Sequence, residues 1–161
     1  MMSEEDLLQA TLGSGLLAFG DALWVLSTEE QRELGGCFQH LGQCFALDIL
    51  ANPMLISGGA VVQLDLDSNK VTDVAPSLEE WAALMVARPG RYAGAQIAAK
   101  WIGVNGPIPE RHRLVLVYPV HLGGQYTPEN LLAMPVDEAI EHCSTRARNF
   151  TLPDKWTMTV K

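Results

Sequence analysis

Local sequence signals between residues 98 and 133 constrain the fold more than any other part of the chain. Apolar residues at helical spacing end at Asn105-Gly106-Pro107, where glycine permits a left-handed cap and proline cannot continue a helix. Residues 114–118 form a continuous apolar run, which is typical of a strand covered on both faces. A Gly123-Gly124 bend follows, and Thr127 and Pro128 then begin a short helix. The segment contains few nucleophiles, which favours a scaffold that presents a surface over an active site.

The rest of the chain alternates between helix and strand signals. Ser3, Ser27 and Ser77 each precede a helical stretch and have an acidic residue three positions later, which is an N-capping pattern. Gly20-Asp21 joins two apolar runs and is a hairpin signal. Pro135 bends the chain before its last predicted helix. We expect helices over residues 1–12, 27–40, 77–87, 93–104 and 136–149, and strands over residues 16–19, 22–26, 45–50, 54–56, 60–66, 70–74, 114–118 and 156–160.

These elements predict an α+β fold. The sheet is expected to include residues 60–66, 71–74 and 114–118, because these segments show the clearest alternation or apolar runs. Residues 88–91 (Arg-Pro-Gly-Arg) are the best internal boundary and are expected at a surface crossing. This boundary separates a sheet-rich half, residues 1–87, from a C-terminal helix–strand–helix part, residues 92–161. A chain of 161 residues usually forms one domain, so we expect the two parts to pack together.

The charge of the chain limits its partners. Nineteen acidic against eleven basic residues give a net charge of −8. This balance disfavours nucleic-acid binding, which requires Lys and Arg to replace phosphate counterions. It equally disfavours an anionic membrane surface, and it suits a cationic protein partner. Acidity that serves only colloidal solubility is the alternative explanation.

The cysteines and the hydropathy pattern indicate a reducing compartment. Cys37, Cys44 and Cys143 are odd in number and show no CxxC spacing, so a disulfide framework is not expected. We find no signal-peptide pattern and no apolar run near the roughly 20 residues of a membrane span. The expected location is the cytoplasm.

Three patterns with possible chemistry favour structural explanations. Residues 65–69 resemble the start of a calcium loop, but Lys70 and Pro76 occupy the positions of its glycine and its bidentate glutamate. Cys37, His40 and Cys44 could share a helical face, but no fourth ligand has metal spacing. The three histidines that could act as a general base have no local nucleophile signature: His112, His121 and His142. We therefore predict no catalytic residues, no metal and no cofactor, although spatial pairing in an enzyme of unrecognised type stays open.

The C-terminal pattern resembles the SUKH superfamily. The similarity is good over residues 101–133, modest over about 16–87 and poor beyond, and Arg111 stands where a glycine is expected. The matching positions are Trp101, Asn105, Gly106, Pro107, Pro109, His112, Arg113, Leu114, Pro119, Leu122, Gly123, Gly124, Tyr126, Glu129, Asn130, Leu131 and Ala133.

The resemblance implies a fold and a function. The fold would be a twisted, largely antiparallel sheet packed by helices. Many bacterial members are immunity proteins that bind and neutralise secreted toxins, and eukaryotic relatives are scaffolds. We therefore expect a non-enzymatic protein that blocks a cationic toxin domain by occlusion. A scaffold or regulatory protein-binding module is the alternative, and an enzyme is the third class.

A candidate binding face follows from the charges. Five carboxylates fall within sixteen residues and are opposed nearby in the sequence only by Lys70. An ordinary solvated edge that blunts strand-to-strand aggregation is the alternative interpretation. The candidate partner-binding residues are Asp65, Asp67, Asp73, Glu79 and Glu80.

Overall fold

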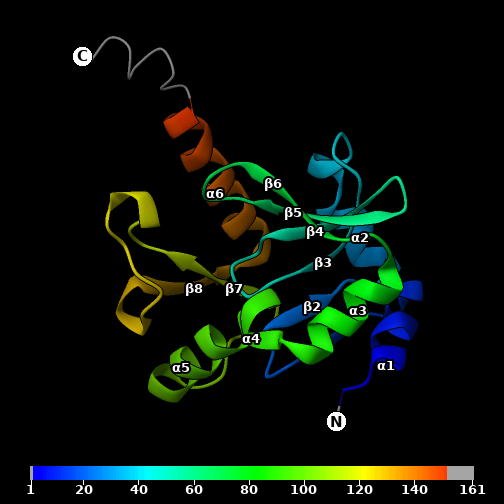
Figure 1. Cartoon of the computed structure of the whole chain (residues 1–161). Helices are drawn as coiled ribbons and strands as arrows, with labels where there is room; N and C mark the ends of the chain where they lie inside the picture. The colour runs from blue at the N-terminus through cyan, green and yellow to red at the C-terminus, as the bar shows by residue number, and fades with distance from the viewer. Residues whose placement is uncertain (1, 152–161) are drawn as a thin grey trace.

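The main sheet is an antiparallel meander whose six strands lie in chain order (Figure 1). The computed structural model describes residues 2–151, with side chains up to residue 146. Each strand pairs antiparallel with the next, so the predicted α+β class is confirmed. The strands are β1 (Leu16–Ala18), β2 (Leu23–Val25), β3 (Gln43–Leu47), β4 (Pro53–Ser57), β5 (Ala60–Asp65) and β6 (Lys70–Ala75).

Helices cover both faces of this sheet. On one face α1 (Glu4–Gln9) and α3 (Leu78–Ala87) pack beside each other, and Trp81 of α3 meets Phe45 of β3 with ring centroids 4.8 Å apart (Figure 1). On the other face α2 (Thr28–Leu34) and α6 (Val136–Thr151) contribute Leu34 and Ile140 to a second apolar cluster. The central strands are therefore buried on both sides, which explains their nearly continuous apolar sequence.

The predicted helix starts are confirmed, and one predicted end is wrong. Ser3, Ser27 and Ser77 each accept a hydrogen bond from the third backbone N–H of the helix that follows. The helix expected over residues 27–40 ends at Leu34, because Gly35-Gly36 follows and the chain continues as a short 3-10 turn. Two further helices are α4 (Pro89–Tyr92), at the predicted crossing, and α5 (Ala95–Asn105). No described helix is long and apolar enough to span a membrane.

One strand prediction requires correction. Residues 114–118 were expected within the main sheet, but β7 (His112–Leu116) pairs only with β8 (Leu131–Pro135) in a separate two-stranded sheet. Burial on both faces is confirmed for β7, because Leu114 and Leu116 face one apolar cluster and Val115 faces the other. The strand β8 was not predicted, since its sequence contains good helix formers and only pairing with β7 makes it a strand. The strand predicted over residues 156–160 lies outside the described residues.

Arg113 joins the two-stranded sheet to the main sheet. Its side chain is only 2 % exposed, and its guanidinium donates to three backbone carbonyls of the N-terminal half. Nη2 lies 2.7 Å from the Asp21 oxygen, and Nη1 lies 3.0 and 3.2 Å from the oxygens of Ala22 and Asp48. Nε donates to its neighbour His112 at 2.8 Å. A buried charge is costly unless it is fully hydrogen-bonded, and here each guanidinium nitrogen has an acceptor.

Replacement of Arg113 by Met should destabilise the fold strongly. The variant keeps a long apolar side chain but removes the donors of three buried carbonyls, so we expect a loss of about 3 kcal/mol or more in the free energy of unfolding. Urea denaturation of the full chain measures this loss. Arg91→Met is the control, because Arg91 is exposed and should change stability by less than about 0.5 kcal/mol. A loss below about 1 kcal/mol for Arg113→Met would show that this connection is not structural.

Candidate protein-binding surface

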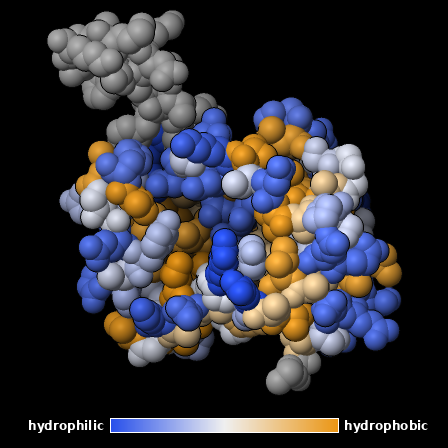
Figure 2. Space-filling view, viewed as in Figure 1, coloured by the Kyte–Doolittle hydropathy of each residue, from blue (hydrophilic) through white to orange (hydrophobic). Residues whose placement is uncertain are grey.

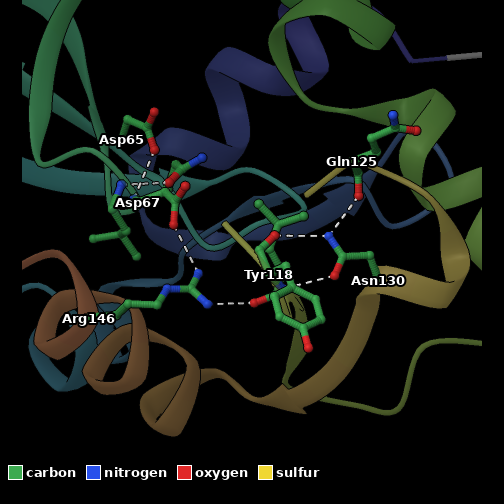
Figure 3. Close-up of polar contacts among 9 residues, drawn as sticks. Asp65, Asp67, Tyr118, Gln125, Asn130 and Arg146 are labelled. Atoms are coloured by element: carbon green, nitrogen blue, oxygen red, sulfur yellow. Dashed lines mark hydrogen bonds and ion pairs between the residues drawn. The ribbon is translucent and has the colours of Figure 1, made fainter. Parts of the chain in front are cut away.

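The five predicted carboxylates do not form one exposed surface. Asp65 ends β5 and Asp67 lies in the turn that leads to β6, and both are half-buried (Figure 3). Asp65 Oδ1 accepts from the backbone N–H of Asp67 at 3.0 Å, and Asp67 Oδ1 lies 3.0 Å from Nη2 of Arg146 on α6. Arg146 is distant in the sequence but close in space, so Lys70 is not the only positive charge near these carboxylates. Asp65 therefore stabilises the turn itself, and Asp67 holds the turn against α6.

The other three predicted carboxylates are exposed. Asp73 lies on β6, the last strand of the sheet, opposite Val62. A charge on an edge strand disfavours pairing with another chain. Glu79 and Glu80 occupy the first turn of α3, where negative charge interacts favourably with the helix dipole. Each therefore has a local structural role, and only these three of the five are open to a partner.

The loop between β7 and β8 presents a group of exposed apolar side chains. Their exposed fractions run from 46 % for Val120 and Tyr126 to 65 % for Tyr118, with Val117 at 54 % and Leu122 at 56 %. We call these five residues the apolar loop. Figure 1 shows this loop at the left side of the molecule, and the space-filling view shows hydrophobic side chains there among polar ones (Figures 1 and 2). Exposed apolar side chains that gather in one place mark interaction surfaces more often than scattered ones do.

Hydrogen bonds hold the apolar loop in one conformation. Asn130 Oδ1 accepts from the Tyr118 N–H at 2.8 Å, and Asn130 Nδ2 donates to the carbonyls of Tyr118 and Gln125 at 3.0 and 2.9 Å (Figure 3). Gly124 lies so close to the Tyr118 carbonyl oxygen that a Cβ there would overlap it. At the base of the loop, Arg146 Nη1 donates to the Leu116 carbonyl at 2.7 Å. The loop is therefore ordered before any partner binds.

Several residues of the sequence motif have structural roles. Trp101 Nε1 on α5 donates to the Leu131 carbonyl at 3.0 Å, and Asn105 Nδ2 donates to the Trp101 carbonyl at 3.1 Å. Arg111, at the position where glycine was expected, adopts a left-handed φ of 60°. This conformation suits glycine and costs other residues roughly 1 kcal/mol. Arg111 is held there by Glu30 and Glu33 on α2, at 3.5 and 2.8 Å. These contacts fix the segments on either side of the apolar loop.

A buried carboxylate, that of Asp48, lies near Arg113. Oδ1 accepts from the backbone N–H groups of Leu50 and Asn52, both at 2.9 Å. Oδ2 accepts from the side chains of Asn52 and Gln63 at 3.1 and 3.2 Å. Burial raises the pKa of Asp48 to about 6, although these hydrogen bonds and the charge of Arg113 act in the opposite direction. Burial also lowers the pKa of Arg113 to about 10, so the guanidinium remains cationic at neutral pH.

The thiols are poorly suited to nucleophilic chemistry. All three cysteines are free, and burial raises the pKa of Cys44 to about 12 and that of Cys143 to about 11. Burial also raises the pKa of the more accessible Cys37. A thiolate is the reactive form, so each raised pKa lowers reactivity at neutral pH. Within the described part of the chain, no three or more His, Cys, Asp and Glu side chains are grouped to hold a metal ion.

Comparisons of the chain with protein-family models, with curated proteins and with solved structures gave no match.

The raised pKa of Asp48 should make stability fall as the pH rises from 4 to 7. A carboxyl whose pKa is higher in the folded state binds more protons there than when unfolded, so its contribution is complete below about pH 4 and is lost through pH 6. The total loss should be about 3 kcal/mol. Denaturation of the wild type and of Asp48→Asn across this range measures it, because the variant lacks the titration. Parallel pH profiles for the two proteins would contradict the assignment.

Proposed function

We propose that this protein is a non-enzymatic immunity protein that binds a secreted bacterial toxin and neutralises it by occlusion. The observation that carries the proposal is the apolar loop, whose exposed side chains are held in place by Asn130 and Gly124. A preordered loop loses little conformational entropy on binding, so its buried apolar area contributes more fully to affinity. The resemblance over residues 101–133 supports the same class of function.

The charge of the chain supports a cationic partner. A net charge of −8 would speed the encounter with a positively charged toxin domain and would disfavour acidic competitors. The apolar loop would form the centre of the contact and charged side chains its rim, as in typical interfaces that bury roughly 1,600 Å² in total. Occlusion then follows if the covered surface is the active site or substrate channel of the toxin. The three free thiols are compatible with the cytoplasm, which we propose as the location.

A neutralisation assay with matched variants tests this function. Each toxin domain encoded beside the gene is expressed in a bacterium with and without this protein, and surviving cells are counted. Wild type should restore growth against one such toxin. The double variant Tyr118→Asp, Leu122→Asp should abolish rescue and weaken binding by about 100-fold or more, because both residues lie in the apolar loop.

The control carries the same charge change elsewhere. Val71→Asp, Val104→Asp also replaces two exposed apolar residues, at 48 % and 70 % exposure, on β6 and α5. It should rescue like wild type, and circular dichroism verifies that both variants are folded. If the apolar-loop variant also rescues, the interface lies elsewhere. If the protein binds a neighbour without changing its toxicity, a scaffold is the better description, and if no neighbouring toxin is neutralised, the immunity proposal fails.

A further inference from the structure

A second surface lies between α2 and α6. It is a groove of about 290 Å³, whose lining includes the buried apolar side chains of Leu34 and Ile140. Three exposed carboxylates line it as well: Glu33 on α2, and Asp137 and Glu141 on α6. The groove is therefore apolar at its base and negative at its edge. More than one hundred residues separate its two sides in the sequence, so only the fold brings them together.

The negative charge around the groove is concentrated and incompletely neutralised. The two helices carry six carboxylates in their described parts: Glu29, Glu30 and Glu33 on α2, and Asp137, Glu138 and Glu141 on α6. The same parts of these helices carry two arginines, Arg32 on α2 and Arg146 on α6, and Arg146 pairs with Asp67 of the β5–β6 turn. Arg111 pairs with Glu30 and Glu33. Among residues with described side chains, no cation forms an ion pair with Asp137 or Glu141. These two carboxylates are one helical turn apart and face the same groove.

Arg111 shows which chemistry this acidic face accepts. Its guanidinium lies 2.8 Å from Glu33, and its Cζ lies over the Trp24 ring at 5.8 Å from the centroid, so it contacts both a carboxylate and an apolar ring. The open groove offers the same combination to a side chain from outside. Long basic side chains fit it, because their aliphatic stems pack on apolar surface while their charged ends reach carboxylates.

We propose that the α2–α6 groove binds an Arg or Lys side chain presented by a cationic segment of the toxin partner. The stem of that side chain packs on Leu34 and Ile140, and its charged end pairs with Asp137 and Glu141. The inference rests on the proposed function for the identity of the partner. It adds a second contact with a defined chemistry, on the helices α2 and α6, to the contact made by the apolar loop.

A peptide titration tests the groove without any toxin. The probe is a fluorescent amphipathic helical peptide with Arg on one face and Leu and Ala on the other, and its binding to the full chain is followed by anisotropy at low salt. The groove variant is Asp137→Lys, Glu141→Lys. The control is Glu4→Lys, Glu5→Lys, which makes the same charge change on α1, away from the groove and from the predicted acidic face. Asp137 lies in the first turn of its helix, as both control residues do, so reversing its charge disturbs the helix dipole in the same way; Glu141 lies one turn further along.

The groove variant should weaken peptide binding by about 10-fold or more, and the control by less than about 2-fold. The milder variant Asp137→Asn, Glu141→Gln should also weaken binding. It replaces the Lys variant in the test if the Lys variant does not fold. A second peptide, with each Arg replaced by the short-stemmed cation 2,4-diaminobutyric acid, which is largely protonated at pH 7, should bind several-fold more weakly. Its charged end cannot reach the carboxylates across the apolar base of the groove.

Several results would overturn the inference. Equal losses in the groove and control variants would show a general field effect, and no saturable peptide binding at low salt would show that no such site exists. Equal affinity for the two peptides would exclude packing of the stem. A change in oligomeric state of the groove variants would assign the groove to contacts between copies of this chain. Failure of the neutralisation assay leaves the peptide result standing, so the two proposals fail independently.

Discussion

A single buried guanidinium connects the parts of this molecule. Arg113 lies at the start of β7 and donates to carbonyls that end β3 and close the β1–β2 hairpin, so it fixes the two-stranded sheet against the meander. The backbone N–H of Leu114 adds a bond to the Ile49 carbonyl at 2.9 Å beside it. Because β7 is placed this way, its far end and the apolar loop project outward. The position of the proposed binding surface thus depends on the buried guanidinium of Arg113 and on the backbone carbonyls that accept its hydrogen bonds.

Features set by a few neighbouring residues could be predicted from the sequence. The three serine caps, the Gly20-Asp21 hairpin and the stop at Gly106 each depend on local backbone geometry, and the structure contains all of them. The sheet to which β7 belongs could not be predicted in this way, because it depends on residues far away in the sequence. A continuous apolar run predicts a strand with two buried faces, but it does not say which strand lies beside it. The strand β8 was missed for the same reason, since its pairing with β7 overrides its helix propensity.

The candidate site was harder to predict than the fold. A cluster of carboxylates in sequence suggested a face over residues 65–80, but Arg146 of α6 pairs with Asp67 and leaves a smaller exposed group. The carboxylates of α2 and α6 lie far apart in the chain and share one groove only after folding. The sequence did contain a signal for the apolar loop. Four apolar residues lie close together just before the Gly123-Gly124 bend, where a loop would usually be polar: Val117, Tyr118, Val120 and Leu122.

Backbone hydrogen exchange of the protein alone tests most directly whether the hydrogen bonds of the apolar loop hold it in one conformation. The amides of Val117, Tyr118, Leu122 and Gly124 all have acceptors within 3.0 Å in the structure. They should exchange at least about 100-fold more slowly than in an unstructured peptide. Exchange at unstructured rates across residues 117–124, with the main sheet still protected, would contradict the account, because the loop would then order only on binding.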